Sequence, residues 1–351
     1  MYLVPALLVI TSIPGSALGF LRPPSTTNLL QEAYTIYGPN INLTTSMTTG
    51  YGEPAQSYWY ASYLSADNGH EYFTIACLSG SAKPGSINSY VSLLDIGTGE
   101  YYGRNNLVPG AITNKTYDID SGTLRQYAST ADLVSVQHAE SSDPYATFNL
   151  TFEPRGPNLY HGGSGIHWWG SGITNEIAYP QLWVTGTITT NGTTVAVIPE
   201  NSLRWMDRQW GSGYASKGWW FFNFYLPNGW VIAAWRTQPV DDTLKLSSFA
   251  TVLFPDGHHE VHALDPNVHE SDSWVSADTN LTYYAKYQLT IPTLDLILNV
   301  KLPHKVGEMT YLEEISSGTT LFEGYATVSG TLCKENISGY GLVEQLYSLN
   351  P

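Results

Sequence analysis

Residues 204–238, with the sequence RWMDRQWGSGYASKGWWFFNFYLPNGWVIAAWRTQ, hold six of the eleven tryptophans of the chain. The aromatic runs on either side of the Asn-Gly pair at 228–229 predict two antiparallel strands joined by a tight turn. So many indoles in one segment indicate either a β-sheet core or the wall of a ligand pocket. This Trp-rich segment therefore limits the fold to one that packs several indole rings together.

The composition favours an all-β protein. Glycine and tyrosine are abundant, at 32 and 25 of 351 residues, and only 13% of the residues are charged. Strand-like runs recur between turn residues, for example residues 57–64 and 70–77 on either side of an Asp-Asn-Gly turn. The one short helix that the pattern favours covers residues 25–37. Strands at such regular spacing predict barrels or sandwiches.

The length favours two domains. A turn-rich stretch at residues 190–202 separates two series of predicted strands. We therefore expect an N-terminal β domain over residues 20–196 and a C-terminal β domain over residues 197–351 that opens with the Trp-rich segment. The net charge of −15, with no local cluster of Lys or Arg, excludes nonspecific attraction to nucleic acid or to an anionic membrane as the main activity.

The first 19 residues form an apolar run ending in Ala-Leu-Gly, which is typical of a cleaved signal peptide. The run is too short for a comfortable membrane span. Six Asn-x-Ser/Thr sequons support a secreted glycoprotein. They begin at Asn42, Asn114, Asn149, Asn191, Asn280 and Asn336. In an oxidising compartment Cys77 and Cys333 either form one disulfide or remain two separate buried thiols.

Asp207 and Arg208 lie between Trp205 and Trp210 in the Trp-rich segment. A carboxylate among indoles loses hydration, and this raises its pKa toward the range where it can deliver a proton. The adjacent guanidinium acts in the opposite direction, and the sequence leaves open which effect dominates. The indoles either fill a core alone, or they enclose an apolar substrate, orient its reacting ends and stabilise a cation.

The glycine-rich segment HGGSGIHWWGSG, residues 161–172, carries His167, Trp168 and Trp169 at its centre. It lacks the Lys-Ser/Thr of a phosphate-binding loop and the Gly-x-Ser-x-Gly of a serine hydrolase. It is interpreted either as a structural loop or as a segment that lines a ligand site.

His258, Glu260 and His262 alternate at a spacing that suits metal ligands on one face of a strand. They directly follow a Pro-Asp-Gly turn, where polar strand ends normally face water. The favoured interpretation is a solvated strand end, and no metal site is expected.

The motif DRQWG, with Asp207, Arg208, Trp210 and Gly211 at its signature positions, and the following WWFFNFYLPNGWVIAAW resemble a known family. This is the lipocalin-like (calycin) superfamily of carotenoid hydratases, kievitone hydratase and fungal Diels–Alderases and hetero-Diels–Alderases. The early stretch YWYASYLSADNGHEYF is similar to its N-terminal half. The resemblance implies two consecutive β-barrel or sandwich domains, a ligand pocket in or between them, and no metal or organic cofactor. The leader and the sequons agree with its secreted fungal branch.

Together with the aromatic segment, the resemblance implies an enzyme of secondary metabolism that directs the cyclisation of a hydrophobic polyketide or terpenoid, foremost a Diels–Alder or hetero-Diels–Alder reaction. Asp207, Arg208 or His167 would bind a carbonyl of the substrate. The predicted aromatic walls are Trp168, Trp205, Trp210, Trp219, Trp220 and Trp235. In the first alternative, a hydratase, Asp207 protonates a prenyl double bond of a terpenoid or prenylated phenolic. The second alternative is a non-catalytic carrier of apolar ligands.

Overall fold

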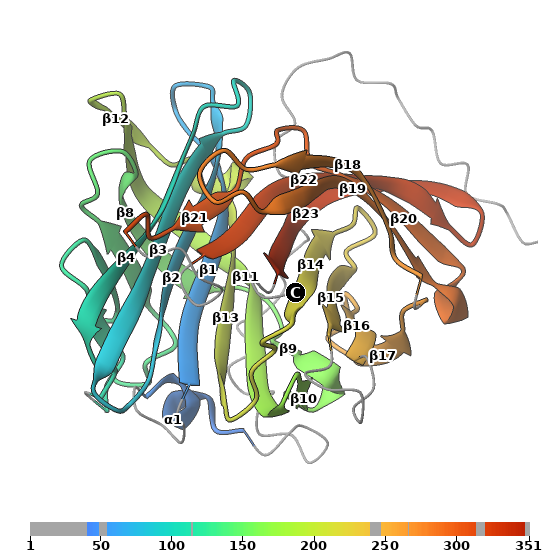
Figure 1. Ribbon diagram of the computed structural model, residues 1–351, viewed down its shortest axis with the longest axis horizontal. Coiled ribbons are helices and arrows are strands. Elements are labelled where there is room, and N and C mark those ends of the chain that lie inside the picture. The colour runs from blue at the N-terminus through green and yellow to red at the C-terminus, as the bar shows by residue number, and fades with distance from the viewer. Residues whose placement is uncertain are drawn as a thin grey trace, which may run out of the picture.

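The computed structural model describes residues 41–48, 55–113, 115–238, 247–265, 267–313 and 320–347. These residues form two curled antiparallel sheets, which confirms the all-β fold with two barrel- or sandwich-like units (Figure 1). The expected signal peptide 1–19 and the expected helix 25–37 lie outside the described residues. In the described part of the chain, no helix is long and apolar enough to cross a membrane.

The first sheet has thirteen strands in the order β4-β3-β2-β1-β13-β11-β8-β7-β6-β5, and β9, β10 and β12 pair with β11. Its strands are β1 (Ala55–Ser65), β2 (Glu71–Gly80), β3 (Gly85–Asp95), β4 (Tyr101–Gly110), β5 (Asp118–Asp120), β6 (Leu124–Ala128), β7 (Gln137–Ser141), β8 (Thr147–Pro154), β9 (Leu159–Tyr160), β10 (Ile166–Trp169), β11 (Gly172–Thr190), β12 (Thr193–Ala196) and β13 (Leu203–Gly211). The helical segments in this half are α1 (Leu43–Met47), η2 (His161–Gly163) and η3 (Pro199–Asn201).

The second sheet has ten strands in the order β17-β16-β15-β14-β23-β22-β20-β19-β18, and β21 pairs with β22. Its strands are β14 (Gly218–Tyr225), β15 (Val231–Thr237), β16 (Ser247–Leu253), β17 (His259–Ala263), β18 (His269–Val275), β19 (Thr282–Ile291), β20 (Leu296–Lys301), β21 (Glu308–Thr310), β22 (Thr320–Leu332) and β23 (Glu335–Tyr347). One 3-10 turn, η4 (Pro292–Leu294), connects β19 to β20. In Figure 1 this sheet runs from yellow to red beside the blue and green first sheet.

Both hairpins that the sequence predicts are present. β1 pairs with β2 across the Asp-Asn-Gly turn, and β14 pairs with β15 across the Asn-Gly turn of the Trp-rich segment. The second half of the Trp-rich segment then joins the second sheet, because β14 also pairs with the C-terminal strand β23.

The change from one sheet to the other comes after β13, the first strand of the Trp-rich segment. β13 pairs with β1 on one side and with β11 on the other, so residues 203–211 complete the first sheet. The turn-rich stretch at 190–202 holds the β11–β12 hairpin and η3, which connect strands of a single sheet. The switch from the first sheet to the second therefore occurs between Gly211 and Gly218, and the domain boundary at 196–197 stays a prediction.

Three hydrophobic cores follow from the alternation of side chains along the strands. Each sheet curls around a core of its own, and a third core lies between the two sheets. On β1, Tyr58 faces the core of the first sheet and Trp59 faces the inter-sheet core. On β14, Trp219 faces the inter-sheet core and Trp220 faces the core of the second sheet. Side chains from both sheets can therefore meet in the inter-sheet core.

Candidate active site

A pocket of about 380 Å³ opens into the inter-sheet core. This volume lies within the range of small-molecule sites, roughly 300–1,000 Å³. Side chains from both sheets line it, and three of them are carboxyl groups: Glu176 on β11, Asp207 on β13 and Glu344 on β23. The aromatic side chains that line it are Trp59, Tyr90, Trp169, Trp210, Tyr214, Trp219, Phe221 and Trp235. We refer to this cavity as the inter-sheet pocket.

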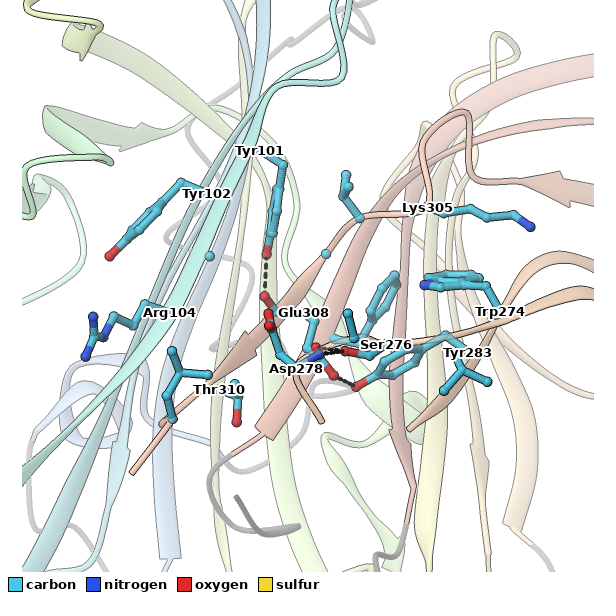
Figure 2. Close-up of a pocket in the computed structure, with 17 residues that line it drawn as sticks. Tyr101, Tyr102, Arg104, Trp274, Ser276, Asp278, Tyr283, Lys305, Glu308 and Thr310 are labelled. Atoms are coloured by element: carbon cyan, nitrogen blue, oxygen red, sulfur yellow. Dashed lines mark hydrogen bonds between the residues drawn. The ribbon is translucent and has the colours of Figure 1, made fainter. Parts of the chain in front are cut away.

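A second cavity, of about 470 Å³, lies where β21 meets β4 and β18 (Figure 2). Its carboxylate, Glu308, accepts hydrogen bonds from the hydroxyls of Ser276 at 2.5 Å, Thr279 at 2.6 Å and Tyr283 at 2.6 Å. Tyr101 on β4 also donates to the Glu308 carbonyl, as Figure 2 shows. Because hydroxyls satisfy both of its oxygens, Glu308 is suited to fastening β21 in place. The inter-sheet pocket is the better candidate for chemistry.

Asp207 lies at the centre of a hydrogen-bond chain in the wall of the inter-sheet pocket. Trp205 Nε1 donates to Asp207 Oδ2 at 2.6 Å, and His161 Nε2 lies 3.1 Å from Asp207 Oδ1. Trp235 Nε1 donates to His161 Nδ1 at 3.1 Å. Since an indole N–H can only donate, Nδ1 carries no proton, and Nε2 must be the nitrogen that donates to Asp207. Burial lowers the pKa of His161 to about 3, so the ring stays neutral.

The glycines after His161 explain how this histidine reaches the pocket. Gly162 and Gly163 have φ values of 67° and 78°, a left-handed backbone that glycine adopts without strain. The tight η2 turn that they form directs His161 into the inter-sheet core, where its side chain is fully buried. The Gly162 N–H donates to Thr251 Oγ1 on β16, so the turn also ties the two sheets together.

Burial raises the pKa of Asp207 well above its ordinary value, and the N–H of Trp205 lowers it only in part. Both observed partners of Asp207, Trp205 and His161, act as donors. A proton on this carboxyl group therefore has no acceptor among the hydrogen-bonded side chains Trp205, His161 and Trp235. It is available to a ligand in the pocket. This arrangement suits a general acid.

Arg208, whose positive charge is expected from the sequence to lower the pKa of Asp207, lies on the opposite face of β13. Neighbouring residues on a strand point to opposite sides, so the DR pair cannot share a pocket. The Arg208 guanidinium donates to the carbonyls of Ser46 at 2.7 Å and Gln209 at 2.7 Å, and it lies 4.2 Å from the ring centre of Tyr58. The Arg208 side chain therefore braces the first sheet and α1 and is not among the residues that line the inter-sheet pocket, where its predicted catalytic role would require it.

His167, the third predicted catalytic residue, is buried behind the pocket wall, next to Glu176. The two side chains approach to 3.6 Å between His167 Nε2 and Glu176 Oε2, and the same oxygen lies 3.6 Å from His161 Nδ1. Neither ring nitrogen of His167 has a hydrogen-bond partner within the described ranges. Burial lowers the pKa of His167 to about 3 and raises that of Glu176 well above its ordinary value. His167 therefore stands behind the pocket lining, and Glu176 is part of it.

Three of the six predicted wall tryptophans, Trp210, Trp219 and Trp235, line the inter-sheet pocket. Trp235 stacks on Phe221 with ring centres 4.4 Å apart. Trp205 lies beneath the wall and contributes its N–H to Asp207. A wide indole surface therefore surrounds the acid.

Two predicted wall residues lie elsewhere. Trp168 is 42% exposed and donates to the carbonyl of Gly170, while Trp220 packs inside the second sheet. In each case the adjacent residue faces the pocket, because strand neighbours alternate. Trp169 takes the place expected for Trp168, and its Nε1 has no hydrogen-bond partner among the residues that the structure describes. Trp169 thus offers a buried donor to a ligand.

His161, Glu176 and Asp207 each offer a ligand atom, and these atoms lie within 4.8 Å of one another, close enough to hold a cation. Both ring nitrogens of His161 are already engaged, one by Trp235 and the other by Asp207. A cation at this position would have to break one of these bonds, so the geometry fits a proton-transfer network better than a metal centre.

The other predicted sites are found as follows. His258 and Glu260 are exposed, whereas the His262 side chain is largely buried and its Nε2 lies 2.9 Å from Glu260 Oε2. Cys77 is buried in the pocket wall and Cys333 is exposed, and both are free thiols. Asn114 lies outside the described residues. The other sequon asparagines are exposed: Asn42, Asn149, Asn191, Asn280 and Asn336.

The sequence analysis did not identify the other titratable groups of the site. They are His161, Glu176, Glu323 and Glu344. His161 opens the glycine-rich segment that the sequence singled out, so a signal for it was present. The three glutamates stand alone among their immediate neighbours in the sequence, and without strand pairing they look like ordinary surface residues.

The fold and the pocket define a class: a two-sheet β protein with buried acids among indoles between the sheets. Residues 100–345 match the AttH-like family, so the chain belongs to that family. It is 28% identical over 298 residues to kievitone hydratase of Fusarium solani subsp. phaseoli, covering 83% of this chain and 82% of that protein. It is 26% identical over 224 residues to dehydratase asqC of Emericella nidulans, covering 62% of each.

Solved structures show the same fold. Kievitone hydratase from Nectria haematococca has a TM-score of 0.85 at 24% identity, over 95% of this chain and 99% of that one. A putative AttH from Nitrosomonas europaea has a TM-score of 0.73 at 18% identity, over 87% and 96%. CghA has a TM-score of 0.56 at 15% identity, over 84% and 88%. These findings confirm the superfamily expected from the DRQWG motif, and the two named relatives support an enzyme.

Proposed function

We propose that the protein is a hydro-lyase that adds water to a prenyl-type double bond of a hydrophobic phenolic, or removes it again. One observation carries the proposal: the buried carboxyl group of Asp207 lines an indole-walled pocket and has only donors as partners. Protonating an alkene needs such an acid. Two of the relatives described above, kievitone hydratase and dehydratase asqC, are named for gain or loss of water.

In the hydration direction, Asp207 transfers its proton to one carbon of the double bond, and the other carbon becomes a cation. Trp219 and Trp235 line the pocket from β14 and β15, and their indoles stabilise the positive charge, since indoles are the strongest cation–π partners among side chains. A water molecule then bonds to the cation and loses a proton. The apolar walls keep competing nucleophiles away until that step.

Trp169 supports binding of an oxygenated substrate. Its Nε1 is buried at the pocket wall without a partner in the described part of the chain. An unsatisfied buried donor costs free energy, and a phenolic or carbonyl oxygen of the ligand would satisfy it. Gln209 and Asn88 are among the polar side chains of a lining that is apolar over most of its area. A mostly apolar ligand with one or two oxygens therefore fits this pocket.

Cyclisation of a polyketide or terpenoid, by a Diels–Alder or hetero-Diels–Alder route, is the second candidate. The stacked pair of Phe221 and Trp235 favours it, because flat aromatic walls can hold an extended polyene in a folded pose. In that reaction Asp207 or Trp169 would only polarise a carbonyl. Loss of Asp207 would then cost far less than in a hydratase.

The deciding experiment replaces Asp207 by Asn and follows the reaction with kievitone, as a prenylated phenolic probe, in water enriched in ¹⁸O. A hydratase incorporates the label, and Asp207→Asn lowers kcat by roughly 100- to 10,000-fold. The exposed Asp256→Asn is the matched control and keeps wild-type rates. Absence of label from the product of the wild-type enzyme, over a panel of prenylated phenolics, would refute the proposed hydratase.

The proposal places this enzyme outside the cell. Two features support secretion: the predicted leader over residues 1–19, and the exposure of the sequon asparagines that the structure describes. Expression of the full chain in a fungal host, followed by N-terminal sequencing and endoglycosidase digestion of the medium, tests it. A mature end at Phe20 and a digestion-dependent loss of mass are expected, whereas retention of the intact leader inside the cell would contradict secretion.

A further inference from the structure

Two glutamates face each other across β22 and β23 inside the inter-sheet core. Glu323 and Glu344 are directly paired in the strand register, and they are only 1% and 8% exposed. Like charges directly opposite each other destabilise a sheet, and burial makes the cost larger. Two carboxyl groups in this position can share the core only if one of them keeps a proton.

Each of these glutamates is held by a tryptophan from a different strand. Trp59 Nε1 on β1 donates to Glu323 Oε1 at 2.8 Å, and Trp219 Nε1 on β14 donates to Glu344 Oε1. Glu344 lines the inter-sheet pocket, as does Leu346 two residues later. Glu323 does not line the pocket, so Glu344 is the member of the pair that a ligand can touch.

The surroundings divide the proton unequally between the two carboxyl groups. Burial and the presence of Glu344 raise the pKa of Glu323 well above its ordinary value. Burial also raises the pKa of Glu344, while Trp219 and Glu323 lower it, leaving it at about 7. Glu323 therefore stays protonated when Glu344 ionises. The other titratable groups that face Glu344 are Cys77, Tyr90, Glu176 and Asp207.

We propose that Glu344 is the second catalytic group of the pocket and takes the proton from the attacking water, while Glu323 is its positioning residue. This inference rests on the proposed hydratase function. It follows from geometry: Asp207 lines the pocket from the first sheet and Glu344 lines it from the second. A substrate between the sheets therefore meets an acid on one side and a base on the other.

The proton balance closes over one turnover. Asp207 gives its proton to carbon and becomes a carboxylate, the water oxygen bonds to the cationic carbon, and Glu344 accepts the proton that this water loses. The net change is one water added to the double bond. After product release, Glu344 returns its proton to Asp207 through water that enters the pocket, and in dehydration every step runs in reverse.

The test compares Glu344→Gln with wild type in the kievitone reaction. An amide keeps the shape and can still accept from Trp219, but it cannot take a proton. We expect kcat to fall roughly 100- to 10,000-fold, and the limb of the pH–rate profile near pH 7 to disappear. Kievitone binding, read from tryptophan fluorescence, should stay within about threefold. Glu335→Gln, an exposed change on the same strand, is the matched control and keeps the wild-type profile.

Glu323→Gln separates positioning from proton transfer. It should keep the limb near pH 7 and lose no more than about tenfold in kcat, because an amide N–H can still donate to Glu344. If Glu344→Gln does not fold, Glu344→Asp decides the matter. Its shortened carboxylate should keep the limb and lower kcat by about tenfold or more.

Two outcomes distinguish failure of the Glu344 role from failure of the hydratase function. If Glu344→Gln turns over within tenfold of wild type and keeps the limb near pH 7, while Asp207→Asn is inactive and label enters the product, the role of Glu344 is overturned and the hydratase stands. Wild-type rates in Glu344→Asp have the same meaning. If the wild-type enzyme incorporates no label with any prenylated phenolic, the hydratase and the role of Glu344 are both overturned.

Discussion

At the scale of single residues, the tryptophans of this protein both exclude water and hold the groups that titrate. An indole brings a large apolar surface and one N–H donor, which is what a buried acid needs to remain in an apolar core. The tryptophans therefore fill the core and form the pocket wall at the same time. The N–H donors and their acceptors are Trp59 to Glu323, Trp205 to Asp207, Trp219 to Glu344 and Trp235 to His161.

Trp205→Phe tests this dual role. The change keeps an aromatic ring but removes the donor to Asp207 Oδ2, so the pKa of Asp207 rises further and the acid becomes weaker. We expect kcat for kievitone hydration to fall about tenfold or more with KM little changed, and the free energy of unfolding to drop by about 1–3 kcal/mol. Kinetics and urea denaturation measure both.

Trp168→Phe is the control for this change. It also removes an indole hydrogen bond, but from an exposed ring outside the pocket. It should leave kcat at the wild-type value. Equal losses of kcat in the two variants would mean that the Trp205 N–H does not act through Asp207.

At the scale of the strand, alternation decides which residues reach the pocket. On β13, Asp207 faces the inter-sheet pocket, and Arg208 faces the core of the first sheet. The same strand ends at Gly211, where an added Cβ would lie 2.5 Å from the carbonyl oxygen of Ile173 on β11. The last residue of DRQWG is thus a packing requirement between β11 and β13, and only the aspartate of the motif offers a reactive group to the pocket.

Arg208→Met separates the two halves of the motif. The guanidinium is buried without a carboxylate within hydrogen-bonding range in the described structure, but it satisfies the carbonyls of Ser46 and Gln209. Losing these bonds should lower the free energy of unfolding by about 1–3 kcal/mol. Turnover of kievitone by the folded variant should stay within about threefold, because the side chain lies behind the pocket lining and does not itself reach the cavity. A hundredfold loss of kcat in a folded variant would restore Arg208 to the catalytic machinery.

The same alternation limits which residues of the site could be predicted from the sequence. Asp207 could be singled out because its indole neighbours are close in the chain, and the hairpins because their turns are local. Choosing Trp169 over Trp168, or Trp219 over Trp220, requires knowing which face of a strand meets the other sheet. Pairing Glu344 with Glu323, or His161 with Asp207, requires the register between distant strands. Those contacts are set by tertiary packing, which no local motif encodes.

At the scale of the whole molecule, the pocket exists only because two sheets pack against each other. The first sheet supplies Asp207 and Glu176, and the second supplies Glu344 and the ring of Trp235. Dense indole packing removes water from all of these acids at once, so their pKa values rise together. The arrangement that creates the acids must also make the stability of the fold depend on pH.

Glu344 gives the clearest form of this dependence. Its pKa is about 7 in the folded protein against an ordinary value of 4.5, so the folded state holds the proton more tightly than the unfolded chain does. The stabilisation from this proton is complete below about pH 4.5, falls as the pH rises through about 7, and is constant above that. His161 and His167, with pKa values of about 3, act in the opposite sense below pH 6.5, where their stabilising effect declines as the pH falls.

Comparing wild type with Glu344→Gln removes the contribution of the two histidines, because both proteins keep them, and the amide at position 344 does not titrate. The unfolding free energy of wild type, relative to the variant, should fall by about 3 kcal/mol between pH 4.5 and pH 7.5, since each unit of pKa shift corresponds to about 1.4 kcal/mol. Urea denaturation across this range measures the difference. A difference that stays flat would mean that Glu344 is ionised in the folded protein throughout, and that indole packing does not hold a proton at this position.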